Sequence, residues 1–197
     1  DKPRLEVENF SLTYHCDKTG KATSIELRYK VINRGQRIAR WCETYIDVVD
    51  AKTKRSAESM RGWWLHEIPD AVSFSRGNTY TYYRQLRANE WDRACYMFNI
   101  SDKPIEGVPK EFGVQYIWPY SHEGIFDVVV IAISGAVKGY GHIQIRISKK
   151  LETSAADELT ELISLQWPSW QDRYAMRVRR MVRRLLRKEP IYSDYFR

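Results

Sequence analysis

Hydrophobic and polar residues alternate along several short segments in the first three quarters of this chain. The clearest case is residues 24–33, SIELRYKVIN, in which every second residue is apolar. A period of two is typical of a β-strand with one face buried and the other in water. The inward positions would be Ile25, Leu27, Tyr29 and Val31. The same pattern, with a slip at Asn9, predicts a strand over residues 4–14 that contains a β-bulge.

Further segments of the same kind follow, separated by short turns rich in Gly, Asn and Lys. One turn contains Gly20, which is free to take a positive φ. In the next strand, ARWCETYIDVVD, the inner face would hold Trp41, Thr44 or Tyr45, Ile46 and Val48. Residues 56–68 fit a strand or a short helix, and later strands are expected over 79–86, after a Gly-Asn turn, and over 93–101, 113–118, 125–134 and 142–148. The Gly-containing stretch 134–141 is expected to be the turn before the last of these. Many short strands without intervening helices indicate an antiparallel β-sandwich or barrel over residues 1–150.

The period changes after Lys150. In AADELTELISLQW, residues 155–167, Leu159, Leu162, Ile163 and Gln166 recur at helical spacing. Pro168 interrupts this pattern, and a second helix is expected at about 169–188, before Pro190. Residues 151–197 are therefore predicted to be a two-helix C-terminal extension.

The charge of the protein is concentrated in the second of these helices. The chain of 197 residues has a formal net charge of +7, and residues 170–188 carry eight Lys or Arg against one acid. Residues 1–169 are nearly neutral, at +1. On a helix, the apolar seam would consist of Val178, Met181, Val182 and Leu185. The residues assigned to polyanion binding are Arg173, Arg177, Arg180, Arg183, Arg184 and Arg187, with Arg179 also flanking the seam.

Three functions fit this basic amphipathic segment. It can be an ordinary solvated helix face, a contact for nucleic acid phosphates through Arg177, Arg180 and Arg184, or a helix that lies on an anionic membrane surface. Trp167 and Trp170 at its start suit the membrane alternative. An acidic protein partner or a second copy of the chain is a further alternative. We favour a non-enzymatic module that contacts nucleic acid phosphates.

The middle of the chain is rich in aromatic residues interleaved with Arg. Such a mixture can form stacking surfaces for bases or sugars, although core packing and cross-strand pairing explain it equally. Adjacent Trp63 and Trp64 would point to opposite faces of a strand, so one of them would be partly exposed. The candidate ligand-contacting residues are Trp63, Trp64, Trp91 and Arg84. This segment supports a second alternative, the sensing of a small ligand.

No catalytic, metal or cofactor motif is present. His66-Glu67-Ile68-Pro69-Asp70 lacks the second His of a zinc-protease helix, and Pro69 would disrupt that helix. The other histidines, including His142, are expected to be surface or strand-edge residues. We therefore expect no enzyme, metal or cofactor.

The cysteines have no metal-binding or disulfide-type spacing. Cys16, Cys42 and Cys95 are far apart and odd in number, which predicts reduced, mostly buried thiols in a reducing compartment. We expect a cytoplasmic protein, with membrane association through a segment outside this chain as an alternative.

Two parts of the chain resemble a known family at the level of the fold. The resemblance rests on PRLEVENFSL, IELRYKV and VINRGQRIARWCETYIDV near the N-terminus, and on FDVVVIAISG and HIQIRIS later in the chain. Residues 3–50 and 125–148 resemble the immunoglobulin-like sandwich modules of the prokaryotic CARDB type. The resemblance implies an immunoglobulin-like sandwich that serves as a non-catalytic binding or spacer module. It transfers no site residues.

Overall fold

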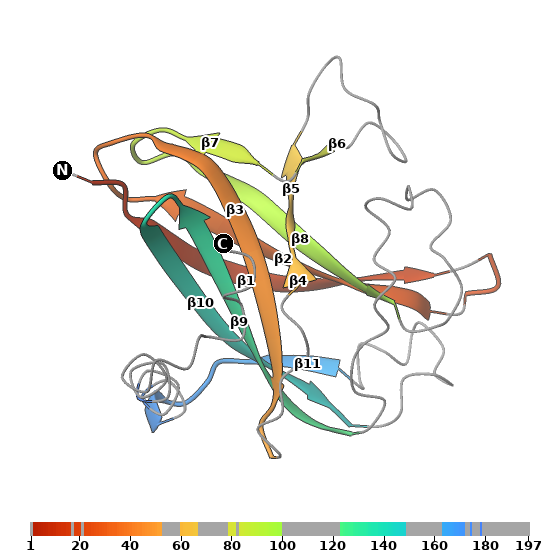
Figure 1. The fold of residues 1–197 in the computed structure, drawn as a ribbon. Coiled ribbons are helices and arrows are strands. Elements are labelled where there is room, and N and C mark those ends of the chain that lie inside the picture. The colour runs from red at the N-terminus through yellow and green to blue at the C-terminus, as the bar shows by residue number, and fades with distance from the viewer. Residues whose placement is uncertain are drawn as a thin grey trace.

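The alternating segments form two antiparallel β-sheets that pack face to face (Figure 1). The predicted mainly β architecture is confirmed. The structure is a computed structural model, and it describes residues 2–16, 18–20, 22–52, 60–66, 79–81, 83–99, 123–148, 163–171, 174 and 178.

The strand order differs from the order in the sequence, so the chain crosses repeatedly between the sheets. The first sheet has the order β1 (Leu5–Cys16), β2 (Ala22–Asn33), β8 (Trp91–Asn99), β5 (Trp63–His66) and β6 (Thr79–Thr81). The second has the order β11 (Ile163–Gln166), β10 (Val137–Ile147), β9 (Gly124–Ser134), β3 (Ala39–Asp50) and β4 (Met60–Arg61). The short strand β7 (Arg84–Leu86) also pairs with β3.

The main core lies between the two sheets. The four residues predicted to point inward from residues 24–33 are at most 1% exposed, which confirms the period-two prediction. Two buried hydrogen bonds cross the core. The hydroxyl of Tyr29 donates to Oγ1 of Thr44 at 2.8 Å, and Nε1 of Trp64 donates to the carbonyl of Cys42 at 2.9 Å. The sheets are therefore joined by specific polar contacts as well as by apolar packing.

Two details of the first strand pair also follow the sequence. The register of β1 against β2 shifts between Glu8 and Ser11, and Asn9 there has a φ of 53°. Gly20, in the turn that follows β1, has a φ of 81°. The predicted bulge and the predicted positive φ are both confirmed.

The side chain of Asn33, at the end of β2, connects three separate parts of the chain. Its Oδ1 accepts hydrogen bonds from the backbone N–H groups of Arg4 at 3.1 Å and Gly35 at 3.0 Å. Its Nδ2 donates to the carbonyls of Arg37 at 2.7 Å, and of Leu86 and Arg87, each at 3.1 Å. Asn33 itself is 0% exposed, so no water can replace these bonds.

The turn before the last hairpin strand is shorter than predicted. Residues 135–136 form the turn, and β10 already begins at Val137. Gly139 and Gly141 therefore lie inside a strand. A Cβ at either position would collide with β1, at Leu5 for Gly139 and at Val7 and Phe10 for Gly141. These glycines permit the close approach of β1 to β10.

The predicted helical extension is not supported. Residues 163–166, expected to be helical, form β11, in which Ile163 pairs with Ile147 of β10. Ile163 is buried and Leu165 packs on the core. These alternate apolar residues suit a strand that pairs with the edge of β10, and this pairing overrides the helical spacing of the apolar residues in the sequence. Beyond β11, helical backbone geometry is described only at Trp170, Gln171, Tyr174 and Val178. These separated residues are too few to assign a helix among the described residues. The rest of the predicted basic helix lies outside the described residues.

Replacing Asn33 by Ala should destabilise the fold severely, because the substitution leaves several buried backbone donors and acceptors without partners. We expect a loss of about 3–5 kcal/mol in the free energy of unfolding, measured by urea denaturation. Arg37→Ala is the matched control, since the exposed Arg37 contributes only its backbone carbonyl to the network. Similar stabilities for the two variants would contradict this role of Asn33.

Candidate ligand-binding site

A β-bulge in β3 creates the most unusual surface in the described part of the molecule. Ala39 pairs with Leu86 and Cys42 pairs with Arg84, so the pairing of β3 with β7 is irregular across Arg40 and Trp41. Trp41 has a φ of 51°, in the left-handed region that bulky residues rarely adopt. Such a conformation costs free energy, and it persists because the pairing on both sides of the bulge fixes the backbone.

The bulge turns the indole of Trp41 outward. Trp41 is 73% exposed, so its predicted place on the inner face of this strand is wrong. The physical reason is the irregular step between Ala39 and Cys42, which are both fully buried although they are three residues apart. A regular strand would place them on opposite faces.

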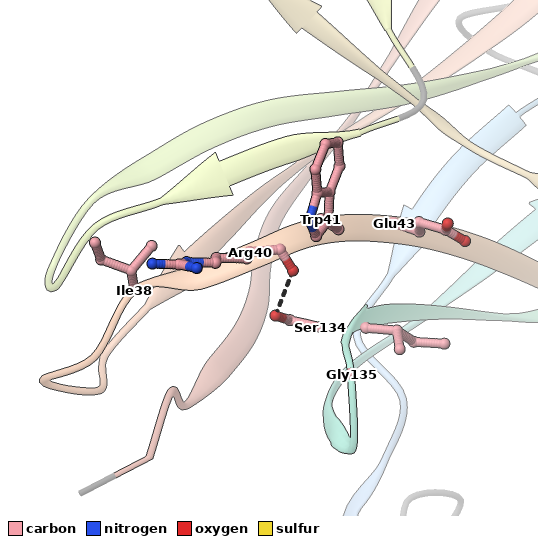
Figure 2. A pocket seen from close by; sticks show the side chains of 7 residues that line it. Ile38, Arg40, Trp41, Glu43, Ser134 and Gly135 are labelled. Carbon is pink, nitrogen blue, oxygen red and sulfur yellow. Dashed lines mark hydrogen bonds between the residues drawn. The ribbon is translucent and has the colours of Figure 1, made fainter.

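An open hollow of about 540 Å³ lies beside the bulge (Figure 2). Its lining combines apolar, aromatic and charged side chains: Ile38, Arg40, Trp41, Glu43, Ile133, Ser134 and Gly135. The hydroxyl of Ser134 donates to the carbonyl of Arg40 at 2.7 Å, which ties the end of β9 to the bulge. The hollow is therefore held between two strands of one sheet.

A chain of contacts supports Trp41 from one side. Its ring meets that of Tyr83 edge to face, with 5.9 Å between the centroids. The guanidinium of Arg61 lies 4.8 Å from the ring centroid of Tyr83 and forms an ion pair of 3.2 Å with Glu43. The hydroxyl of Tyr45 donates to the same carboxylate, and burial raises the pKa of Tyr45, so this donor keeps its proton.

This arrangement can hold a ligand that has both a ring and a negative charge. Trp41 and Tyr83 are 73% and 46% exposed, and aromatic rings of this kind stack on planar or sugar rings. Among the described residues, no acidic side chain pairs with the exposed guanidinium of Arg40. The carboxylate of Glu43, by contrast, is already neutralised by Arg61. The guanidinium next to the stacking surface therefore favours an anionic group.

The two adjacent tryptophans predicted to contact a ligand are buried. Trp63 is 3% exposed and Trp64 is 0% exposed, so the expectation that one would be accessible is wrong. Trp64 lies in the core beneath the β3 bulge, where it donates to Cys42, and Trp63 packs on Tyr96 at 5.6 Å between centroids. Neither indole therefore offers a stacking surface.

The other two predicted contact residues are accessible but engaged with neighbours. Trp91 is 48% exposed, and the ammonium group of Lys30 lies 4.2 Å from its ring centroid. Arg84 is 2.5 Å from the carboxylate of Asp92 and 3.9 Å from that of Glu90. Trp91, on β8 of the first sheet, does not line the hollow beside Trp41, and Arg84 joins β7 to the start of β8 through these ion pairs.

The described residues include little of the predicted basic surface. The six residues assigned to polyanion binding lie outside them, namely Arg173, Arg177, Arg180, Arg183, Arg184 and Arg187. The same holds for three residues of the seam, Met181, Val182 and Leu185, while the fourth, Val178, is half-buried.

Three exposed aromatic side chains lie around the start of the basic segment. Trp167, Trp170 and Tyr174 are 67%, 71% and 64% exposed. The ring of Trp167 also touches Phe10 of β1, with 6.3 Å between centroids. Large exposed rings beside a basic segment are unusual for a surface that faces only water.

The buried thiols are not activated for chemistry. Cys42 and Cys95 are free and fully buried, as predicted, and the side chain of Cys16 lies outside the described residues. Burial raises the pKa of Cys42 to about 11 and that of Cys95 well above its ordinary value. A nucleophilic cysteine needs a lowered pKa, so these two thiols are structural.

His142 lies inside a polar cluster rather than at the surface or a strand edge. Its side chain is 9% exposed, and its Nε2 lies 2.9 Å from Oδ1 of Asp127, which also accepts a hydrogen bond from Gln144 at 2.9 Å. The expectation of an exposed histidine is wrong here. The described residues contain no group of three or more His, Cys, Asp or Glu suited to a metal ion, and no described helix could cross a membrane.

Comparison with known proteins gives no family. No protein-family model matches the chain, and no curated protein matches it. Among solved structures, β-glucosidase 3B from Thermotoga neapolitana in complex with glucose is similar over 71% of this chain, with 12% identity and a TM-score of 0.31. The same enzyme in complex with α-D-glucose gives 9% identity over 71% of this chain and a TM-score of 0.28. The similar region spans 16% of the enzyme chain in each case.

Replacing Trp41 by Gly should leave the fold nearly as stable as the wild type. Gly removes a left-handed conformation that costs a non-glycine residue about 1–2 kcal/mol, which offsets the loss of the ring contact with Tyr83, worth about 0.5–1.5 kcal/mol. Trp64→Ala, in the core, should cost about 3–5 kcal/mol. Urea denaturation of both variants tests this contrast, and a large loss in Trp41→Gly would refute it.

Stability should decline in alkaline solution because the buried thiols resist ionisation. The raised folded-state pKa of Cys42, about 11 against 9.0, means that stability is intact below about pH 9. It then falls towards pH 11, by up to about 1.4 kcal/mol per pH unit for each such group. The free energy of unfolding, measured between these limits, should fall less steeply in Cys42→Ala. Equal slopes would exclude a contribution from Cys42.

Proposed function

We propose that this chain is a non-enzymatic, immunoglobulin-like binding module that works without a cofactor. The order β1-β2-β8-β5 matches the A-B-E-D sheet of an immunoglobulin domain, and β10-β9-β3 matches its G-F-C sheet. This order supports the finer fold assignment. In such sandwiches, ligands bind to surface loops and irregular strands while the sheets stay rigid.

The proposed ligand is a polyanion, with single-stranded nucleic acid favoured. The observation that carries this proposal is the exposed, strained Trp41 beside the guanidinium of Arg40. Single-stranded nucleic acid presents unstacked bases and phosphates together, which suits an indole and a guanidinium only one residue apart. Trp41 and Tyr83 take the stacking role first expected of Trp63 and Trp64.

The basic segment provides the second part of the proposed surface. With a net charge of +7 over residues 170–188, it would attract a polyanion over a longer range than a single side chain can. Arg177, Arg180 and Arg184 are the proposed phosphate contacts. The proposed location is the cytoplasm, and two free buried thiols support it because such thiols suit a reducing compartment.

A membrane surface is the second candidate, and one specific observation favours it. Trp167, Trp170 and Tyr174 are all more than 60% exposed at the start of the basic segment. Aromatic rings beside basic residues are typical of helices that lie at the interface of anionic membranes. This candidate predicts a dominant role for Trp167 and Trp170 and none for Trp41.

Binding assays on the full chain should separate these functions. We expect single-stranded RNA or DNA to bind at low salt, and the affinity to fall at least 10-fold between roughly 50 and 200 mM salt. Trp41→Ala should weaken this binding roughly 5-fold or more, because stacking on one ring contributes about 1–3 kcal/mol. Fluorescence anisotropy with labelled oligonucleotides measures both effects.

Matched controls and other ligands decide between the alternatives. Trp91→Ala, which removes an exposed indole in the other sheet, should leave oligonucleotide affinity unchanged within about two-fold. Attraction of the basic segment to anionic liposomes at low salt fits either function, so the readout that separates them is whether binding depends on Trp41 or on Trp167 and Trp170. Liposome binding lost in Trp167→Ala with Trp170→Ala, together with no oligonucleotide binding, would replace the nucleic acid proposal by the membrane function. No binding to either would leave a protein-interaction module.

A further inference from the structure

The second sheet carries a buried apolar cluster on the face that points away from the main core. In β9, Phe126, Val128 and Val130 belong to the main core, whereas the alternate residues belong to a separate cluster. Because successive side chains of a strand point to opposite faces, this cluster lies on the outer face of the sheet. Its members are Tyr45, Val129, Ile131 and Ile133, with Tyr140 partly buried beside them.

This outer cluster is as inaccessible as the core. Ile131 is 0% exposed, Val129 is 3% exposed and Tyr45 is 3% exposed. The middle of an uncovered outer sheet face would be open to water, so these values require a layer of chain over the sheet. The cluster and the hollow beside Trp41 both include Ile133, so the buried cluster adjoins the hollow.

Acidic groups lie within the same face. Asp47 and Asp127 are 5% and 4% exposed, and they pair in the strand register with Val129 and Val49 respectively. Asp127 contacts His142 and Gln144, as described above, and Asp47 also has an interaction partner. A covering layer with apolar residues at its centre and basic residues at its flanks would match this face.

We propose that the basic segment of this chain, residues 173–188, docks on the outer face of the second sheet. Its apolar seam would cover Tyr45, Ile131 and Tyr140, and Arg179, which flanks the seam, would lie on the side of the carboxylates of Asp47 and Asp127. This proposal does not depend on the ligand of the module.

The position of the segment in the chain supports this occupant. β11 runs beside β10 at the edge of the same sheet, and Val178 follows the end of β11 by twelve residues. Val178 is half-buried, unlike the exposed Trp170 and Tyr174. From Val178 to Leu185, the seam of a helix spans about 10 Å, which equals the width of the strands β10, β9 and β3 at their usual spacing.

Docking in this way leaves the opposite stripe of the segment exposed. Arg173, Arg177, Arg180 and Arg184 would then face solvent on the same side of the molecule as the hollow beside Trp41. The stacking surface and most of the positive charge would form one binding face, rather than two separate sites.

Methyl NMR on the full, ligand-free chain tests the proposal. With labelled Ile, Leu, Val and Met methyl groups, we expect nuclear Overhauser contacts from Ile131 and Val129 to Met181, Val182 and Leu185. Contacts from Ile131 to another segment instead would overturn the proposal. Contacts that appear only in a mixed sample of differently labelled chains would assign the face to a second copy and would overturn it as well.

Paired substitutions in the segment provide a second test. Leu185→Gln should lower the melting temperature by roughly 4–8 °C, since the seam loses a buried apolar group. Arg184→Gln, the neighbouring residue on the exposed stripe, should change it by less than about 2 °C. Equal effects of the two substitutions would show that the seam is not docked. Oligonucleotide affinity, measured separately, reports on the proposed function and not on docking.

Discussion

The hydrogen bonds of Asn33 fix the geometry on which both the fold and the candidate site depend. One buried amide holds the N-terminal segment at Arg4, the turn after β2 at Gly35 and the end of β7 at Leu86. Because β2 and β7 belong to different sheets, this side chain sets their relative position. β7 in turn pairs with the bulged part of β3 and follows Tyr83 directly, so the contact between Tyr83 and Trp41 depends on an amide that holds the opposite end of β7. An apolar residue of similar size would fill the space but satisfy none of these backbone groups.

Much of the sandwich could be predicted from the sequence, because burial on one face imposes a period of two. That constraint located β2, β3, β9 and the bulge at Asn9 correctly. It failed where a tertiary contact overrode a local preference. Residues 163–166 have helical spacing, yet they pair with β10, and Gly139 looks like part of a turn, yet it allows β1 to approach. Such contacts join residues far apart in the sequence, and no local pattern contains them.

The candidate site was harder to predict, since composition does not distinguish buried from exposed aromatic residues. In the aromatic-rich middle segment Trp63, Trp64 and Tyr96 are buried while Tyr83 and Trp91 are exposed, and the isolated Trp41 is the most exposed of these rings. One signal did exist. In a regular strand, every second residue before the buried Ile46 would also point inward, and this would bury the charged Arg40. The alternation must therefore shift between Arg40 and Cys42, where the bulge lies. The role of the arginines of residues 173–188 in ligand binding stays a prediction that rests on their charge alone.

β11 has a consequence for self-association. Without it, β10 would be an edge strand with a free row of backbone donors and acceptors, long enough to pair with a strand of another molecule. The chain protects the Gln144–Ile147 part of this edge with a four-residue strand that it supplies from later in its own sequence. Proteolytic removal of the C-terminal part would therefore do more than delete positive charge. It would also uncover a template for strand exchange and aggregation.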